Sequence, residues 1–454
     1  MAFSYADSGK EIQTGEIKMK EAVIVSAVRT PQGKFGGSLK DLSAVELGSI
    51  AVEGLFEKID RRPECSNDVL ECKPEELEDL ENCQVEEEYY NWNDELETLA
   101  VDEVILGNVL QGGQGQNPAR QVSIKTGIPR EVPAYTVNMV CGSGMKAVTS
   151  AAGKIESGKA DVVIAGGFES MSNAPYILPD ARWGRTMDIT GKGETVDMMV
   201  WDGLYEIFYD CHMGKTAENL AELYDISREE QERLSIESQN RALKAIEEGI
   251  FDDEIVPVEV RDGVVDQDEQ PRETDLGAVK DLPPVFDKDG TITAATSSGI
   301  SDGAAALLIT SKEFADKNDL EILAKVSDYT SVGVDPKYMG LGAAAAMEDL
   351  LNKTGLEKKD VDLFEENEAF AAQMLACMEA TDTPKYGVGI NEDGGEKINP
   401  YGSGISLGHP IGATGARILV TLAHALKRRE DHRGLANLCV GGGIGIATLL
   451  ERDK

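Results

Sequence analysis

One succession of elements occurs near both ends of this chain, and it restricts the folds that the chain can adopt. It consists of a Gly-rich turn, a helix and a strand that runs into two or three glycines. The first copy comprises the turn 141–144, the helix to about residue 155 and the strand 162–165, and the apolar strand 135–140 precedes it. The second copy comprises the turn 408–415, the helix 416–427 and the strand 436–440. Strands alternating with helices are typical of α/β proteins, so the repetition predicts two similar α/β halves.

Hydrophobic spacing indicates further elements. We expect strands at 22–28, 101–106 and 361–364, and helices at 43–59 and 227–248. Residues 61–97 are crowded with Glu, Asp and Asn, and we interpret them as an acidic insertion that forms a peripheral flap or is partly disordered. The cysteines of this segment, Cys65, Cys72 and Cys83, are irregularly spaced and have no nearby His. They are expected to be ordinary thiols rather than metal ligands.

The chain is strongly acidic, because 82 Asp and Glu against 44 Lys and Arg give a formal net charge of −38. Such a surface repels nucleic acid and anionic membranes, so neither is expected as a partner. We interpret the excess as a sign of a salt-rich source, the habitat of a halophile, where dissolved ions screen the mutual repulsion of carboxylates. An ordinary acidic protein is the alternative.

No apolar run reaches the ~20 residues of a membrane helix. Residues 1–20 are polar and lack the apolar core of a signal peptide. We therefore expect a cytoplasmic protein. The seven cysteines form no C-x-x-C pair and there are only four histidines, a pattern that predicts neither a disulfide framework nor a structural zinc site.

Cys141 is the first candidate for chemistry. It follows an apolar strand and precedes Gly142-Ser143-Gly144 and a helix, so its sulfur is expected at a helix N-terminus. There the helix dipole and the unpaired N–H groups should lower the pKa of the thiol and favour the reactive thiolate. The glycines would let the backbone approach a substrate carbonyl closely. A buried structural cysteine is the competing interpretation.

Three other candidates end strands or lie on tight turns. Cys439 ends the strand before Gly441 and can move a proton if it lies near Cys141, although a cysteine in this position alone is typical of a core. His409 lies on the turn 408–415, oriented as a general base for a cysteine should be. Asn367 follows the strand 361–364 and either caps the next helix or fixes a water that donates to an oxyanion.

The remaining signals are weaker. His424 lies in a helix and His432 in a charged stretch, and both are expected to be structural or solvated. The Gly clusters match neither a dinucleotide-binding G-x-G-x-x-G unit with a suitably spaced acidic residue nor a G-x-x-x-x-G-K-[ST] phosphate loop. Neither of these nucleotide-binding folds is therefore indicated.

Together and in this order, these motifs resemble those of the thiolase family, from about residue 22 to residue 450 apart from the acidic insertion. The matching stretches are 29–37 (RTPQGKFGG), 137–146 (VNMVCGSGMK), 166–172 (GGFESMS), 212–214 (HMG), 298–303 (SGISDG), 367–370 (NEAF), 408–412 (GHPIG) and 439–443 (CVGGG). The resemblance implies an acyltransferase that makes or breaks 3-ketoacyl-coenzyme A (CoA) by reversible Claisen condensation.

The resemblance implies a role for each candidate. Cys141 would attack the thioester and carry the acyl group, and His409 would activate it. Cys439 would exchange the α-proton of the second acetyl-CoA. One oxyanion hole would combine His409 with a water held by Asn367, and the other would use the N–H groups of Cys141 and Gly441.

The resemblance also implies a substrate site. Ser298 and His212 match positions beside the pantetheine arm of CoA, whereas Met213, Met339 and Phe370 match the wall of the acyl pocket. Acetyl-CoA and 3-ketoacyl-CoA would react by a ping-pong mechanism, and no metal or redox cofactor is implied.

The implied fold is α/β, with two similar halves that each have a mixed five-stranded sheet between helices, and a loop domain. The N-terminal half would cover 20–170 and 300–321, the loop domain 171–299 and the C-terminal half 322–454. The loop domain would bind CoA and serve oligomerisation, and a homodimer or homotetramer is expected. A second addition relative to the family is expected around 381–396.

Alternatives remain. Within the family, a degradative thiolase for longer 3-ketoacyl-CoA competes with the short-chain enzyme. From another class, an inactive CoA-binding scaffold subunit would keep the fold without catalysis. A ketoacyl synthase, which uses one Cys with two His, is disfavoured because Asn367 stands at the position of the second His.

Overall fold

The computed structural model describes residues 19–66, 84–179, 181–184, 193–383 and 397–453. Its centre is a ten-stranded sheet in the order β16-β17-β18-β15-β1-β14-β7-β5-β6, with the short β2 (Gly33–Lys34) beside β14. The N-terminal part consists of β1 (Ala22–Arg29), β5 (Glu103–Gly107), β6 (Ala134–Val137), β7 (Val162–Ser170) and β14 (Ser301–Ser311). The C-terminal part consists of β15 (Ala324–Gly333), β16 (Leu363–Glu366), β17 (Arg433–Val440) and β18 (Ile444–Glu451).

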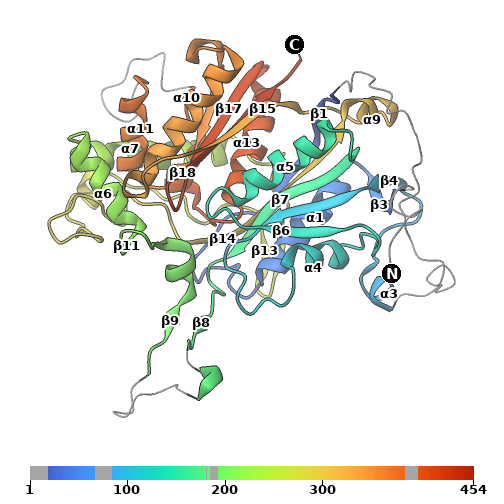
Figure 1. Cartoon of the computed structure of the whole chain (residues 1–454), viewed down its shortest axis with the longest axis horizontal. Helices are drawn as coiled ribbons and strands as arrows, with labels where there is room; N and C mark the ends of the chain where they lie inside the picture. The colour runs from blue at the N-terminus through green and yellow to red at the C-terminus, as the bar shows by residue number, and fades with distance from the viewer. Residues whose placement is uncertain (1–18, 67–83, 180, 185–192, 384–396, 454) are drawn as a thin grey trace, which may run out of the picture.

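The predicted α/β architecture with two related halves is confirmed, and both halves are visible side by side in Figure 1. Five strands form the N-terminal part as expected, whereas four belong to the C-terminal part among the described residues. The parts join where β1 pairs with β15 through Val23–Lys325 and Ile24–Ala324. Parallel and antiparallel pairs both occur, so the sheet is mixed.

Two helices lie on the inner face of both parts of the sheet. They are α5 (Ser143–Glu156) and α13 (Thr414–Arg429), and they pack against each other. Their apolar side chains form one core with inward residues from both parts of the sheet. Because α5 and α13 begin after the turns of the two sequence copies, the packing brings those turns together.

Other helices cover the outer faces. Helices α1 (Ala44–Glu57) and α4 (Pro118–Lys125) pack on the N-terminal part, and α10 (Gly342–Thr354) packs on the C-terminal part beside α11 (Ala371–Ala380). Strand β1 shows why both faces are apolar. Its residues Ala22, Ile24 and Ala27 face the central core, whereas Val23 and Val25 face α1, and a bulge between Ile24 and Ser26 shifts the alternation.

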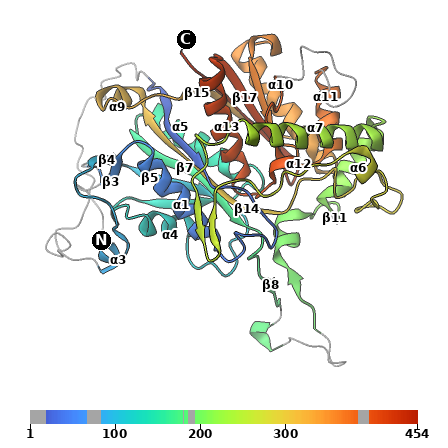
Figure 2. The same cartoon turned by 180° about the vertical axis from the view of Figure 1, so that it is seen from behind.

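Residues 171–299 leave the body of the molecule and return to it. Strands β8 (Tyr176–Ile177) and β9 (Val196–Asp197) form a narrow arm that projects downward in Figures 1 and 2. Helices α6 (Met213–Leu223) and α7 (Arg228–Glu247) then lie against the C-terminal half, as the rear view shows.

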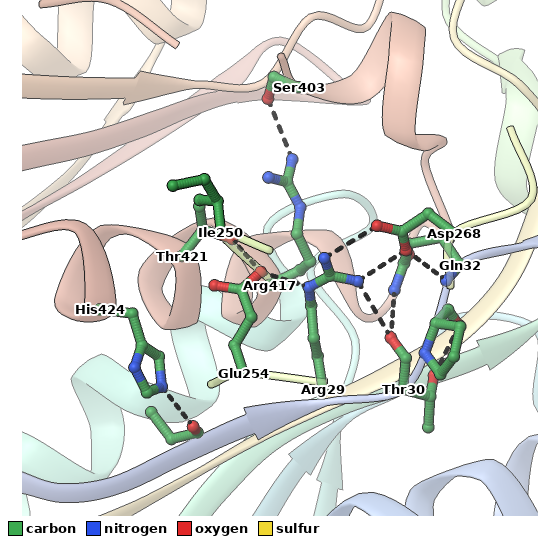
Figure 3. A network of polar contacts seen from close by, with 12 residues as sticks. Arg29, Thr30, Gln32, Ile250, Glu254, Asp268, Ser403, Arg417, Thr421 and His424 are labelled. Carbon is green, nitrogen blue, oxygen red and sulfur yellow. Dashed lines mark hydrogen bonds and ion pairs between the residues drawn. The ribbon is translucent and has the colours of Figure 1, made fainter. Parts of the chain in front are cut away.

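A buried ion network fastens this segment to the sheet (Figure 3). Arg29, the last residue of β1, donates to Glu254 at 2.6 Å and to both oxygens of Asp268 at 2.7 and 2.9 Å. All three side chains are almost completely buried. Removing one partner would leave a buried charge without compensation, so this contact fixes the segment 171–299 on the N-terminal half.

The acidic segment 61–97 differs from the expected flap at both ends. Its first residues form β3 (Arg61–Cys65), which pairs in parallel with β4 (Glu97–Val101). Near its other end the Trp92 ring packs edge-on against Phe56 at 5.5 Å and its Nε1 donates to the Thr126 carbonyl at 2.8 Å. The ends are therefore part of the folded body. Residues 67–83, with Cys72 and Cys83, lie outside the described residues, as do residues 384–396 of the second expected addition.

Among the described helices, none combines the length and the apolar character that a membrane span requires.

Candidate active site

Cys141 lies on a strained turn between β6 and α5. Val140, immediately before it, has φ 45°, a conformation that a β-branched residue rarely adopts. Hydrogen bonds hold this turn: Asn138 Oδ1 accepts from the Val140 N–H at 3.0 Å, and Ser143 Oγ accepts from the Met139 N–H at 2.8 Å and donates to the Val140 carbonyl at 2.6 Å. The turn presents Cys141 one residue before the helix cap, where the sequence predicts it.

The expected lowering of the Cys141 pKa is wrong. Cys141 is partly buried, and the removal of water from around its sulfur raises the pKa of the thiol to about 11. The N–H groups of Gly441 and of Cys141 itself donate to the sulfur and lower the pKa, and the charge of Glu169 raises it again. Desolvation therefore outweighs the helix terminus, and Cys141 is a thiol at neutral pH that needs a base.

His409 has the properties of that base. It is buried, and burial together with the positive charge of Arg417 lowers the pKa of its imidazole to about 3. The ring is therefore neutral at physiological pH and able to accept a proton. Its backbone N–H is anchored by the Gly299 carbonyl at 3.1 Å and by Ser301 Oγ at 3.2 Å. The amide of Asn367 faces the ring, with Nδ2 at 3.5 Å from Nε2.

Cys439 is the penultimate residue of β17 and is fully buried. Burial holds the pKa of its thiol well above the ordinary value, and the charge of Cys141 raises it further. This influence of Cys141 on Cys439 agrees with a short separation of the two residues. The residues that follow the two cysteines are also in contact, because a Cβ added to Gly142 would lie 2.9 Å from Cγ2 of Val440.

Glu169, which sequence reasoning did not select, ties the turn that carries His409 to residues 108–110, which follow β5. Its carboxylate accepts from the N–H groups of Val109, Leu110 and Gly412 at 3.0 to 3.1 Å, and from Asn108 Nδ2 at 2.8 Å. Burial raises the pKa of this carboxyl to about 7. Glu169 lies in the motif 166–172, but only the fold shows that its carboxylate contacts the turn that carries His409.

Ile411, two residues beyond His409, belongs to the same apolar cluster as Cys141. The starts of α5 and α13 are also in close contact, since a Cβ on Gly144 would lie 2.7 Å from the Ala416 nitrogen. The structure thus brings the predicted catalytic residues, including Gly441, to one junction of β17, α5 and α13.

The predicted substrate residues lie on the adjoining side. Met213, Met339, Phe370 and Cys439 share one apolar cluster, and the methyl of Met213 would lie 2.9 Å from a Cβ on Gly441. The N–H of Ser298 donates to the Ala369 carbonyl at 3.0 Å, next to Phe370. Met213, Met339 and Phe370 therefore pack in the same core as Cys439, and Ser298 lies beside Phe370.

An aromatic row extends this wall. His212 caps α6 by accepting from the Gly214 N–H at 3.1 Å and stacks on Phe286 at 4.7 Å. Phe286 in turn meets Phe370 edge-on at 5.7 Å. Sequence reasoning missed Phe286, and the only local signal is its position after the Pro pair at 283–284, which marks a loop.

The other two histidines have structural contacts. His424 Nε2 bonds to the Ala27 carbonyl at 2.8 Å (Figure 3), and His432 Nδ1 bonds to the Arg452 carbonyl at 2.5 Å. This agrees with the interpretation that neither takes part in the chemistry.

The mixed sheet between helices, with two cysteines and a histidine at one junction of its two halves, defines an α/β enzyme fold. Residues 22–72 and 76–313 match the family description "Thiolase, N-terminal domain", and residues 320–452 match "Thiolase, C-terminal domain". The chain belongs to the thiolase family. The first match covers the acidic segment 61–97 apart from residues 73–75.

Curated relatives agree over nearly the whole chain. An acetyl-CoA acetyltransferase of Syntrophomonas wolfei is 45% identical over 436 residues, covering 95% of this chain and 99% of that protein. One from Pseudomonas aeruginosa is 45% identical over 441 residues, covering 96% of this chain and 100% of that protein.

Solved structures give the same result. The Bacillus anthracis acetyl-CoA acetyltransferase has a TM-score of 0.82 at 41% identity, covering 96% of this chain and 100% of that one. Human mitochondrial 3-ketoacyl-CoA thiolase in complex with CoA has a TM-score of 0.81 at 36% identity, covering 96% and 99%.

Proposed function

We propose that this thiolase condenses two acetyl-CoA to acetoacetyl-CoA and CoA, and catalyses the reverse thiolysis, through an acetylated Cys141. The observation that carries the proposal is the meeting of Cys141, Cys439 and the turn of His409 at one junction of the fold. One sulfur can then act as nucleophile and the other as proton donor to carbon.

In thiolysis, His409 takes the proton of Cys141, and the sulfur forms a bond to the 3-keto carbon of acetoacetyl-CoA. The bond between C2 and C3 then breaks, and its electron pair becomes the enolate of acetyl-CoA. The thiol of Cys439 donates its proton to this carbon, which releases acetyl-CoA. The raised pKa of Cys439 supports this role, because the thiol holds its proton until a carbon base develops.

In the second half, the thiol of CoA attacks the acetyl group on Cys141. Its proton goes to the Cys439 thiolate, and the proton on His409 goes to the departing sulfur of Cys141. Both residues return to their starting state, and condensation is the same sequence in reverse.

Two oxyanion sites support these steps. The N–H groups of Cys141 and Gly441, which converge on the sulfur, would hold the oxygen on the acetyl carbon. His409 and a water on Asn367 would hold the enolate oxygen. The Asn367 Oδ1 has no hydrogen-bond partner among the described residues, which supports a place for such a water.

Acetoacetyl-CoA is favoured as substrate because the relatives from Syntrophomonas wolfei and Pseudomonas aeruginosa are named acetyl-CoA acetyltransferases. The alternative, a thiolase for longer 3-ketoacyl-CoA, draws support from the similarity to the human 3-ketoacyl-CoA thiolase. We propose the same catalytic and substrate-binding residues for both alternatives. CoA thioesters are the substrates in each case, and no separate cofactor is proposed.

The segment 171–299 is proposed as a loop domain that binds CoA and serves assembly, between the halves 20–170 with 300–321 and 322–454. We further propose a cytoplasmic homodimer or homotetramer from a salt-rich source. These proposals rest on the family resemblance and on the charge of −38.

Steady-state thiolysis tests the proposed reaction. Acetoacetyl-CoA and ketoacyl-CoAs of longer chain are compared at varied CoA concentrations. We expect the highest kcat/KM with acetoacetyl-CoA and parallel double-reciprocal lines, the pattern of a ping-pong mechanism. A higher kcat/KM with longer chains would favour the degradative enzyme, and no turnover with any of them would favour the scaffold.

A further inference from the structure

Thr414, which opens α13, contacts the ring of His409 at Nδ1. Its Oγ1 lies 2.6 Å from His409 Nδ1 and donates to the Pro410 carbonyl at 3.0 Å. Thr414 is fully buried, so water cannot replace either contact.

Counting hydrogens decides which ring nitrogen carries the proton. A hydroxyl has one hydrogen and can accept from other donors. If the Thr414 hydrogen points to Pro410, the oxygen accepts from Nδ1–H of His409, and both short contacts are hydrogen bonds. If the hydrogen points to Nδ1 instead, Oγ1 and the Pro410 oxygen are left 3.0 Å apart with no hydrogen between them. The first arrangement is the more stable one.

The orientation of Asn367 agrees with this arrangement. Its Nδ2 lies 3.5 Å from His409 Nε2, so a hydrogen on Nε2 would face another donor. With the hydrogen on Nδ1, Nε2 has a free lone pair that can take the proton of Cys141. The tautomer that Thr414 favours is thus the one that the base needs.

A neutral partner on Nδ1 has a second consequence. A carboxylate there would stabilise the imidazolium, but the Thr414 hydroxyl carries no charge. Arg417 lies one turn after Thr414 in α13 and donates to Ser403 Oγ at 3.0 Å (Figure 3). Its positive charge acts on the His409 ring. These surroundings do not stabilise the imidazolium, so its proton passes readily to the departing sulfur.

We propose that Thr414 is a positioning residue whose hydroxyl holds neutral His409 with its hydrogen on Nδ1 and its Nε2 lone pair facing the substrate. The inference rests on the proposed function of His409 as the base for Cys141.

Two variants separate the effect of the Thr414 hydroxyl from the effect of its packing. Thr414→Val keeps the shape and loses the hydroxyl, whereas Thr414→Ser keeps the hydroxyl and loses the methyl. The rate at which Cys141 becomes acetylated by acetyl-CoA is followed by mass spectrometry. We expect Thr414→Val to slow acetylation by about 10–100-fold, the usual effect of losing a partner behind a functional histidine, and Thr414→Ser to remain close to the wild type.

A spectroscopic measurement complements the acetylation rates. The ¹⁵N signals of histidine-labelled protein distinguish the two neutral tautomers, and with four histidines the His409 signal can be assigned from a His409→Asn variant. We expect hydrogen on Nδ1 in the wild type and in Thr414→Ser. This readout decides the question even if Thr414→Val does not fold.

Hydrogen on Nε2 in the resting wild type, or a Thr414→Val variant that acetylates faster than Thr414→Ser, would overturn the inference. If the wild type itself fails to acetylate Cys141, the proposed function fails instead, so the two outcomes are distinguishable.

Discussion

At the scale of single residues, two opposing influences act on the Cys141 sulfur. The N–H groups of Gly441 and Cys141 favour the thiolate, as the sequence predicts for a helix start. Burial favours the thiol and prevails, because the protein replaces water around the sulfur. In the proposed mechanism the reactivity of Cys141 therefore depends on His409, whose burial keeps the ring neutral.

This balance predicts how Cys141 reacts with iodoacetamide. Because the thiol pKa is raised to about 11, the thiolate fraction stays small and grows about tenfold per pH unit between pH 7 and pH 9. The rate of alkylation at Cys141, followed by peptide mass spectrometry, should rise in proportion, and Cys211 in the same sample serves as a control for general reactivity. A plateau below pH 9 would mean that the pKa is depressed instead.

The residues of the site could be predicted from the sequence, but their electrostatics could not. Cys141, His409, Asn367 and Cys439 follow strands or lie on Gly-rich turns, and such positions can be read along the chain. The raised thiol pKa depends on what surrounds the sulfur in three dimensions. The same is true of Phe286, whose role arises only from contacts with distant residues.

At the scale of elements, the strands at 22–28, 361–364 and 436–440 and the helices at 43–59, 227–248 and 416–427 were predictable from spacing. Strand β6 ends at Val137, three residues early, because the Cys141 turn begins there. Strand β14 was not predicted, because its run of Ala and Leu resembles a helix. Its pairing with β7 requires a glycine at position 166, because a Cβ there would lie 2.2 Å from the Ala305 oxygen.

The Arg29 network is the contact between elements whose loss should weaken the fold most clearly. Arg29→Met leaves Glu254 and Asp268 buried without their cation, and we expect the free energy of unfolding to fall by about 3–5 kcal/mol. Arg233→Met, which breaks the exposed pair with Glu229, is the control and should cost less than about 0.5 kcal/mol. Urea unfolding of the two variants measures both changes, and equal effects would contradict the importance of the buried network.

At the scale of the whole molecule, the charge of −38 is spread over a fold that other thiolases share. Like charges on a compact surface repel one another, and dissolved salt screens that repulsion. The net charge therefore predicts how the stability of the protein depends on salt, which the fold alone does not predict.

We expect the thermal unfolding midpoint to rise as KCl increases from low to molar concentration. Screening reduces the repulsion more in the compact state than in the expanded unfolded chain. Differential scanning calorimetry across the salt series measures the effect. A midpoint that falls with salt would remove the interpretation of a salt-rich source.

The account as a whole depends on acetyl transfer to one sulfur and proton exchange at a second. Intact-protein and peptide mass spectrometry after incubation with acetyl-CoA tests both, using the wild type, Cys141→Ala and Cys439→Ala, with condensation to acetoacetyl-CoA assayed in parallel. We expect an acetyl group on Cys141 in the wild type and in Cys439→Ala, none in Cys141→Ala, and condensation by the wild type alone. An unmodified Cys141 in the wild type, or normal condensation by Cys439→Ala, would contradict the account.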